Sequence, residues 1–191
     1  SAIPETLLES MLFGTVKGAY TGANDCKGLI DEAGHGTLFL DEINSMPKPL
    51  QGKLLRVIQE NSYRKVGGTR SETMHCRIIS STNVEPSECI KVGTLRSDLF
   101  YRLSVHTLEI LPLNQRKMDI QPLINHFICK YGAKYGLHQL KLCEDACSAL
   151  LAYSYLGNVR ELENIVESAI TQVDHTQLIT LSTLPERLLN N

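Results

Sequence analysis

Two adjacent carboxylates at the end of a short apolar run are the residues of this chain best suited to chemistry. The run spans residues 36–40 (GTLFL), and Asp41 and Glu42 follow it directly. It is too short for a helix and is typical of a strand buried on both faces. Ligands of open α/β sheets bind beyond the carboxyl ends of the strands, where one acid can hold Mg²⁺ while the other accepts a proton from water. A strand that ends in a solvated acidic turn has equal support from this run alone.

A second apolar run and a connecting helix are the elements expected to position these acids. Residues 77–82 (RIISST) form the second run, which ends in Asn83. A strand, a helix and a second strand predict a parallel pair, so Asn83 is expected at the same edge as Asp41 and Glu42. The connecting helix is indicated by apolar residues at helical spacing, namely Leu50, Leu54, Val57 and Ile58.

A short helix predicted over residues 95–103 contains two arginines. Arg96 and Arg102 are six positions apart, which turns them about 120° from each other on the helix. They therefore cannot share one face. Residues 105–111 predict a third strand, and only helices are expected after Pro112, so we place a domain boundary between residues 112 and 113.

The second part of the chain predicts three amphipathic helices. The first has Asp119 as its N-cap and a regular apolar stripe. The second covers residues 144–153, and the third has Asn158 as its N-cap with Glu161 in capping-box position. The apolar positions of the first and third helices are Ile120, Leu123, Ile124, Phe127, Ile128, Tyr131, Leu162, Ile165, Val166, Ala169 and Ile170.

Arg160 is unusual because a cation in the first turn of a helix opposes the helix dipole. The cost is about 0.3–1 kcal/mol when the side chain is exposed. A phosphate bound nearby would reverse the sign of this effect, and an ion pair with Glu161 or Glu163 would do the same.

The first 33 residues predict a helix followed by a glycine-rich loop. The helix begins near Pro4 and ends at Gly14, with apolar residues at helical spacing. Residues 17–23 (KGAYTGA) are too small and flexible to pack on themselves, so Tyr20 is expected as an exposed contact residue. The alternative is that Tyr20 folds back onto the body. Residues 29–33 predict a helical turn or a second loop. The apolar residues of the first helix are Leu7, Leu8, Met11 and Leu12.

Composition limits the class of protein. The chain has 191 residues, of which 42% are hydrophobic and 21% charged, which suits one domain, or one domain with a small appendage. The formal net charge of −2 argues against DNA contact by this segment. No apolar run approaches the roughly 20 residues that span a bilayer, and no signal segment opens the chain, so we expect a cytoplasmic protein without membrane contact.

The six cysteines are expected to be reduced thiols, because no CxxC pair occurs and no export signal is present. Cys143 and Cys147 are four residues apart and His138 is nearby, a spacing that suggests a metal site. A helical core face explains this spacing better than zinc.

In order along the chain, these motifs resemble the AAA+ domain of bacterial enhancer-binding proteins, the transcriptional activators of the sigma-54 RNA polymerase. The resemblance covers nearly the whole chain. The GA[FY]TGA loop, taken together with the other motifs in order, is highly specific. The motifs are KGAYTGA (17–23), GTLFLDE (36–42), KLLRVIQE (53–60), VGG (66–68), IISSTN (78–83), RSDLFYRL (96–103) and GNVREL (157–162).

The resemblance implies a role for each matched residue. Asp41 would hold the magnesium of ATP, and Glu42 would polarise the attacking water. Asn83 would be the first sensor. Arg96 and Arg102 would be arginine fingers that reach the next subunit's nucleotide or hold the interface, and Arg160 would be the second sensor in the lid. The sigma-54 contact would be the loop of Lys17, Gly18, Ala19, Tyr20, Thr21, Gly22 and Ala23, with Tyr20 and Thr21 at its tip.

The implied fold is α/β: a parallel-sheet P-loop NTPase (AAA+) core, residues 1–112, incomplete at its N-terminus, followed by a small all-α lid, residues 113–191. The implied function is ATP hydrolysis in a homo-oligomeric ring of six or seven subunits, coupled to remodelling of the sigma-54 polymerase closed complex. DNA would be bound only by a separate domain absent here.

Three departures from the family pattern qualify these expectations. Tyr20 stands where phenylalanine is more frequent, and Tyr155 and Leu156 replace a Trp-Pro pair, which can shift the lid hinge. No G-x-x-x-x-G-K-[ST] motif occurs, so the phosphate loop, the first strands and the asparagine that restrains the catalytic glutamate would lie upstream of Ser1.

We therefore interpret the chain as a fragment, or a sequence incomplete at its start, that binds nucleotide poorly and is inactive alone. The alternatives are a non-catalytic sigma-54-binding module and another AAA+ branch, such as a clamp loader or a helicase loader. The KGAYTGA loop argues against another branch.

Overall fold

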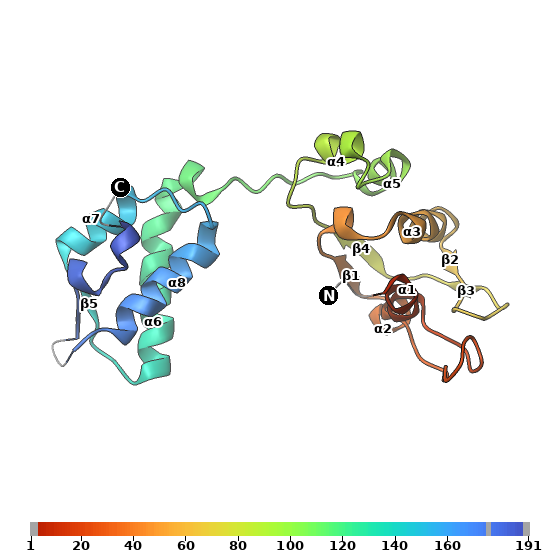
Figure 1. Cartoon of the computed structure of the whole chain (residues 1–191), viewed down its shortest axis with the longest axis horizontal. Helices are drawn as coiled ribbons and strands as arrows, with labels where there is room; N and C mark the ends of the chain where they lie inside the picture. The colour runs from red at the N-terminus through yellow and green to blue at the C-terminus, as the bar shows by residue number, and fades with distance from the viewer. Residues whose placement is uncertain (1–3, 175–176, 189–191) are drawn as a thin grey trace. The chain divides into compact units, whose positions relative to one another are not determined.

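The computed structural model describes residues 4–174 and 177–188, in two compact units (Figure 1). Unit 1 is Ser1–Leu108 and unit 2 is Glu109–Asn191. No helix in the described part of the chain is long and apolar enough to cross a membrane. All six cysteines are free thiols.

The centre of unit 1 is a pair of parallel strands, as the sequence predicts. Strand β1 (Thr37–Leu40) pairs with β4 (Arg77–Ser80), with Thr37 opposite Arg77 and Leu40 opposite Ser80. The connection runs through helix α3 (Lys48–Glu60), which ends at Asn61 in a left-handed conformation. The carboxyl ends of β1 and β4 therefore meet at one edge of the sheet.

The prediction that both faces of this sheet are buried is wrong for the described structure. Leu38 and Leu40 face the core, whereas Phe39 is 57% exposed and Ile79 is 42% exposed. The residues alternate because the core of unit 1 packs on one face of the pair, and no described element covers the other face.

The remaining helices of unit 1 pack around the inner face of the sheet. They are α1 (Glu5–Phe13), α2 (Leu29–Ala33), the 3₁₀ turn η1 (Ile43–Ser45), α4 (Pro86–Val92) and α5 (Ser97–Leu103). A short antiparallel hairpin joins β2 (Ser62–Tyr63) to β3 (Glu72–Thr73). The predicted helical turn at residues 29–33 is confirmed. The predicted apolar face of α1 is only partly correct: Leu12 is buried and Leu8 packs on the core, but Leu7 and Met11 are each 47% exposed.

The predicted third strand is absent from the described structure. Residues 105 and 106 lie in a turn after α5, residues 107–111 belong to no helix or strand, and Val105, Leu108 and Ile110 are 74–86% exposed. A β-rich composition forms a strand only when a neighbouring strand can pair with it, and no described strand lies beside this segment.

Unit 2 is a helical bundle built on the predicted apolar stripes. Helices α6 (Ile120–Tyr135), α7 (Glu144–Ala152) and α8 (Asn158–Thr171) enclose one core, and the α8 stripe from Leu162 to Ile170 is at most 2% exposed. In α6, Leu123 and Ile128 are only half-buried. The expectation of helices alone is wrong, because β5 (Lys141–Leu142) pairs in parallel with β6 (Leu178–Ile179). The described part of the unit also contains the 3₁₀ turns η2 (Leu113–Gln115), η3 (Lys117–Asp119), η4 (Leu181–Thr183) and η5 (Glu186–Leu188).

The two predicted helix caps have different outcomes. Asp119 is the N-cap of α6, as predicted, but its side chain makes no capping bond, and its carboxylate pairs with Arg116 at 3.3 Å. Asn158 lies inside α8, and its Oδ1 accepts the Leu113 backbone N–H at 2.8 Å. Gly157 is the N-cap of α8. Glu161 Oε2 accepts its N–H at 2.8 Å from the fourth helical position, so the predicted capping box with Asn158 is not formed.

Candidate functional site

Polar side chains gather where β1 and β4 end. Asp41 and Glu42 follow β1, and Ser81 and Asn83 follow β4; we call these four residues the strand-end cluster. Asn83 Nδ2 donates to Glu42 Oε1 at 3.0 Å, and Ser81 Oγ donates to Asp41 Oδ1 at 2.5 Å. The prediction that Asn83 emerges beside the two acids is confirmed, and the parallel pairing is the reason.

Glu42 has an unusual backbone conformation. Its φ of 49° and ψ of 57° lie in the left-handed region, which costs a non-glycine residue about 1–2 kcal/mol. The Glu42 N–H donates to Ser81 Oγ at 3.1 Å, and Ser45 Oγ lies 3.5 Å from Glu42 Oε2. These contacts hold the strained residue so that its carboxylate faces Asn83. Strain of this kind is found preferentially at functional sites.

Asn44 of η1 closes the cluster from one side. Its Nδ2 donates to Asn83 Oδ1 at 3.3 Å, while its Oδ1 is buried with no hydrogen-bond partner among the described residues. Asn83 is thus held by both Glu42 and Asn44.

The oxygen donors of the strand-end cluster suit a hard cation. Asp41, Glu42 and Asn83 are exposed, and carboxylate oxygens are the protein ligands that Mg²⁺ prefers. Asp41 uses Oδ1 for Ser81, and no described residue bonds its Oδ2. The donor set therefore fits a magnesium ion carried by a phosphate. The backbone amides and lysine of a G-x-x-x-x-G-K-[ST] loop are not part of this sequence.

The two predicted finger arginines are exposed, and each is tied within unit 1. Arg96 is the N-cap of α5, and its guanidinium binds Asp98 at two points, 3.0 and 2.7 Å. The hydrogen bond from Arg96 holds the pKa of the Asp98 carboxyl below its ordinary value. Arg102 Nη2 donates to the Ile58 carbonyl of α3 at 3.2 Å. Neither arginine has a hydrogen bond to the strand-end cluster among the described residues.

Arg160 lies exposed in the first turn of α8, in unit 2. The two acids offered as alternative partners are engaged elsewhere. Glu161 bonds Gly157 and the Tyr153 hydroxyl, and Glu163 binds Lys130 at 2.6 Å. No described acid forms an ion pair with Arg160. The unfavourable interaction of its charge with the helix dipole is therefore not offset by any acid in this part of the chain.

The glycine-rich loop exposes its aromatic residue. Gly18 and Gly22 both have φ of +84°, and Ala23 donates its backbone N–H to the Tyr20 carbonyl at 2.9 Å. Tyr20 is 51% exposed, so the alternative in which it folds back onto the body is wrong for this structure. The turn after β2 supports the loop closely, because a Cβ on Gly67 would lie 2.5 Å from Ala19 Cβ.

Asp31 joins the exit of this loop to the supporting turn. Its Oδ2 accepts the Gly28 N–H at 3.0 Å and lies 3.4 Å from Lys65 Nζ, and its Oδ1 accepts a short hydrogen bond from the Tyr63 hydroxyl. Burial raises the pKa of the Asp31 carboxyl, but the bonds from Tyr63 and Gly28 and the charge of Lys65 outweigh it, so the pKa lies below its ordinary value.

Replacing this carboxylate by an amide is expected to destabilise the protein in a pH-dependent way. Asp31→Asn should lower the free energy of unfolding by about 1–3 kcal/mol at pH 7, because donors are left unpaired. The folded-state pKa is lowered, so the stabilisation is complete above the unfolded pKa of about 3.9 and is lost as the pH falls through the folded-state pKa. Urea unfolding at several pH values measures the difference between variant and wild type.

The neighbouring Glu32 provides the control for the Asp31 prediction. Glu32 is exposed, with no hydrogen bond from its side chain among the described residues. Glu32→Gln should change the stability by less than about 0.5 kcal/mol. A pH-independent effect of Asp31→Asn would contradict the prediction.

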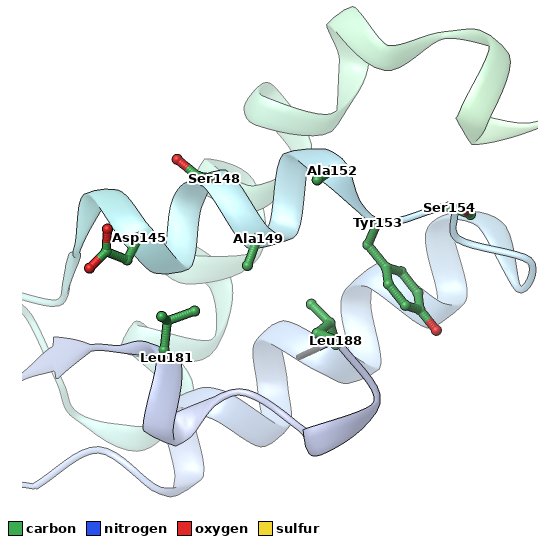
Figure 2. Close-up of a pocket in the computed structure, with 8 residues that line it drawn as sticks. All are labelled: Asp145, Ser148, Ala149, Ala152, Tyr153, Ser154, Leu181 and Leu188. Carbon is green, nitrogen blue, oxygen red and sulfur yellow. The ribbon is translucent and has the colours of Figure 1, made fainter. Parts of the chain in front are cut away.

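A separate open groove of about 590 Å³ lies in unit 2 (Figure 2). Figure 2 shows Asp145 at one end and the Tyr153 ring at the other, with Leu181 and Leu188 facing α7 across the groove. None of the predicted site residues lines it. Among the described residues, no group of three His, Cys, Asp or Glu side chains is placed to hold a metal ion, and this includes Cys143 and Cys147.

The sequence-based prediction missed Ser81 and Asp31. Ser81 could have been found from the sequence, because it follows the same strand as Asn83 and precedes Asn83 by two residues. Asp31 carries none: its partners Tyr63 and Lys65 are more than 30 residues away, and only the folded chain brings them together.

Comparisons with protein families cover nearly the whole chain. A family model described as "Sigma-54 interaction domain" matches residues 1–109, and one described as "AAA+ ATPase lid domain" matches residues 114–191.

Individual relatives agree with these matches. The "Transcriptional activator RocR" of Bacillus subtilis (strain 168) is 45% identical over 185 residues, 97% of this chain and 40% of RocR. The "Regulatory protein AtoC" of Escherichia coli (strain K12) is 46% identical over 171 residues, 89% of this chain and 37% of AtoC. A solved structure of NtrX from Brucella abortus in complex with ATP is 35% identical, with a TM-score of 0.86, over 98% of this chain and 41% of the NtrX chain. The chain spans about two fifths of the length of these relatives.

Proposed function

The chain belongs to the sigma-54 interaction domain family, and on that premise we propose that it couples ATP hydrolysis to activation of the sigma-54 RNA polymerase. The observation that carries the proposal is the hydrogen bond of 3.0 Å between Asn83 and Glu42 at the carboxyl edge of two parallel strands. It joins a polar sensor to a carboxylate that is exposed, strained and beside a second acid. ATP hydrolysis uses an acid that holds Mg²⁺ and a group that positions or deprotonates the attacking water.

The strand-end cluster supplies the roles of a hydrolytic site. Asp41 holds magnesium, which when bound neutralises charge on the phosphates. Glu42 accepts a proton from the attacking water, and Asn83 senses the γ-phosphate. The bond from Asn83 orients the Glu42 carboxylate. Since Glu42 is engaged with Asn83, a phosphate that draws Asn83 away frees the carboxylate to act on water.

The arginines act between subunits of a ring of six or seven copies. Arg96 and Arg102 are exposed on one short helix, where a neighbouring subunit's nucleotide can be reached. Arg160, without an acidic partner among the described residues, contacts phosphate as the second sensor.

We place the functional boundary between residues 1–112 and 113–191, because Leu113 is fully buried in the core of unit 2.

The exposed loop around Tyr20, whose contact with a partner does not depend on hydrolysis, supports a second candidate. In it, the segment is a non-catalytic module that binds sigma-54 polymerase. ATPase activity of this segment that rises with its concentration, as ring assembly requires, would exclude the module.

The exposed loop is the proposed contact with sigma-54, and Tyr20 tests it. We expect Tyr20→Ala in the full-length protein to weaken binding to sigma-54 polymerase at least tenfold, because a half-exposed aromatic anchor is lost. The ATPase kcat should stay within twofold, since Tyr20 is remote from the strand-end cluster in the contacts described. Binding and hydrolysis are measured on the same preparations.

Val92 is a matched control for Tyr20, because it is 79% exposed on α4. Val92→Ala should change neither binding nor kcat by more than twofold. Unchanged binding by Tyr20→Ala would remove the loop from the proposal, and an equal loss with Val92→Ala would show that the effect is not specific.

A further inference from the structure

A fully buried glutamine of α3 connects two parts of unit 1 that carry proposed site residues. Gln51 is 0% exposed. Its Nε2 donates to the Met46 carbonyl at 2.8 Å and to the Thr94 carbonyl at 2.7 Å, and its Oε1 accepts the Arg96 backbone N–H at 2.9 Å. Both N–H donors of the side chain are therefore satisfied, which a buried amide requires.

The first end of this connection is the turn after the acids. Met46 ends η1, the 3₁₀ turn that begins directly after Glu42. Within that turn Ser45 contacts Glu42, and Asn44 donates to Asn83. The backbone that Gln51 holds at Met46 thus belongs to the segment that shapes the strand-end cluster.

The second end is the start of α5. Gln51 binds the residue two positions before Arg96 and the backbone of Arg96 itself. The Arg96 guanidinium lies over Gly52, where an added Cβ would be 3.5 Å from Nη1, and Asp98 fixes its plane at two points. Arg96 is therefore held by backbone contacts to Gln51 and by side-chain contacts to its own helix.

We propose that Gln51 is a positioning residue that fixes the position of Arg96 relative to the strand-end cluster of its own subunit. The inference rests on the proposed function, in which Arg96 acts on the nucleotide of a neighbouring subunit. It goes further, because it identifies the Gln51 side chain as the connection through which a movement of Glu42 and η1 changes the position of Arg96. An apolar side chain would fill the same space without binding either end, whereas this amide fixes three backbone groups from two segments.

The test is a double-mutant cycle in the full-length assembled protein. Gln51→Met keeps the size of the side chain and removes its hydrogen bonds. We expect it to lower the ATPase kcat at least fivefold, with the nucleotide KM within twofold. Arg96→Ala should also lower kcat, and adding Gln51→Met to Arg96→Ala should lower it by no more than twofold further, because Gln51 acts through Arg96.

Val57→Ala controls for a merely structural effect. Val57 is buried on the same helix, and its truncation lowers the Tm without touching Arg96. At an equal loss of Tm, Val57→Ala should leave kcat within twofold. If it reproduces the kinetic loss of Gln51→Met, or if Gln51→Met lowers kcat equally in the Arg96→Ala background, the inference is overturned. An unchanged kcat for Arg96→Ala would overturn the finger role itself, and the inference with it.

Hydrogen exchange gives a second readout that does not depend on activity. The Arg96 amide should exchange at least tenfold faster in Gln51→Met than in wild type, whereas amides of β1 should keep their rates. Equal acceleration in both places would indicate general loosening and would contradict a specific link.

Discussion

Replacing Glu42 by glutamine is expected to lower the ATPase kcat of the full-length protein by about 100- to 10,000-fold, the range for loss of a general base. Glutamine keeps the shape of the side chain, and its Oε1 can still accept the bond that Asn83 donates to Glu42 Oε1. What it loses is the ability to take a proton from water. The nucleotide KM should therefore change by less than threefold. Steady-state kinetics at saturating magnesium measure both parameters.

Glu85 supplies the matched control for Glu42. It is an exposed acid that precedes α4 and makes no side-chain cap. Glu85→Gln changes the net charge by the same amount in the same unit, so its kcat should stay within twofold. If Glu42→Gln lowered kcat less than tenfold, Glu42 would not be the general base, and another residue would have to accept the proton from water.

Local patterns in the sequence were sufficient to predict the centre of the site. The sequence shows two apolar runs with a helix between them, and strands connected in this way are parallel. This predicts Asn83 beside Glu42, and the structure agrees. The same patterns predict the core stripe of α8 correctly. These features depend on period and chain order, which can be seen without knowing any distant contact.

Features that depend on distant neighbours were not predictable. Residues 105–111 have strand-like composition, yet no described strand pairs with them. The exposed Phe39 follows from the same cause, since nothing described covers its face of the sheet. Gln51 and Asp31 look like ordinary polar residues until the fold places their partners around them. The left-handed backbone of Glu42 has no sequence signal either.

The largest stability effect is expected where the chain crosses itself at the base of the exposed loop. Gly28 lies against residues 12–14, and a Cβ there would be 2.3 Å from the Gly14 backbone N and 2.4 Å from the Phe13 carbonyl carbon. Both contacts are with backbone, so no side chain can move aside. Gly28→Ala should therefore cost about 3 kcal/mol or more. For a unit of this size, that lowers the Tm by about 12 °C or more in a calorimetric scan.

Gly18 separates the effect of this crowding from the effect of backbone strain. The φ of Gly28 is −91°, which any residue adopts, so the cost of Gly28→Ala is steric. Gly18 has a φ of +84° with nothing within 4 Å of an added Cβ, so Gly18→Ala should cost only about 1–2 kcal/mol, from conformation alone. The crossing also aligns Thr15 with Cys26, whose backbones exchange two hydrogen bonds of 3.0 Å at the base of the loop. Gly28→Ala should thus also weaken sigma-54 polymerase binding. Equal losses of stability in the two variants would mean that crowding at the crossing adds nothing to the cost of Gly28→Ala.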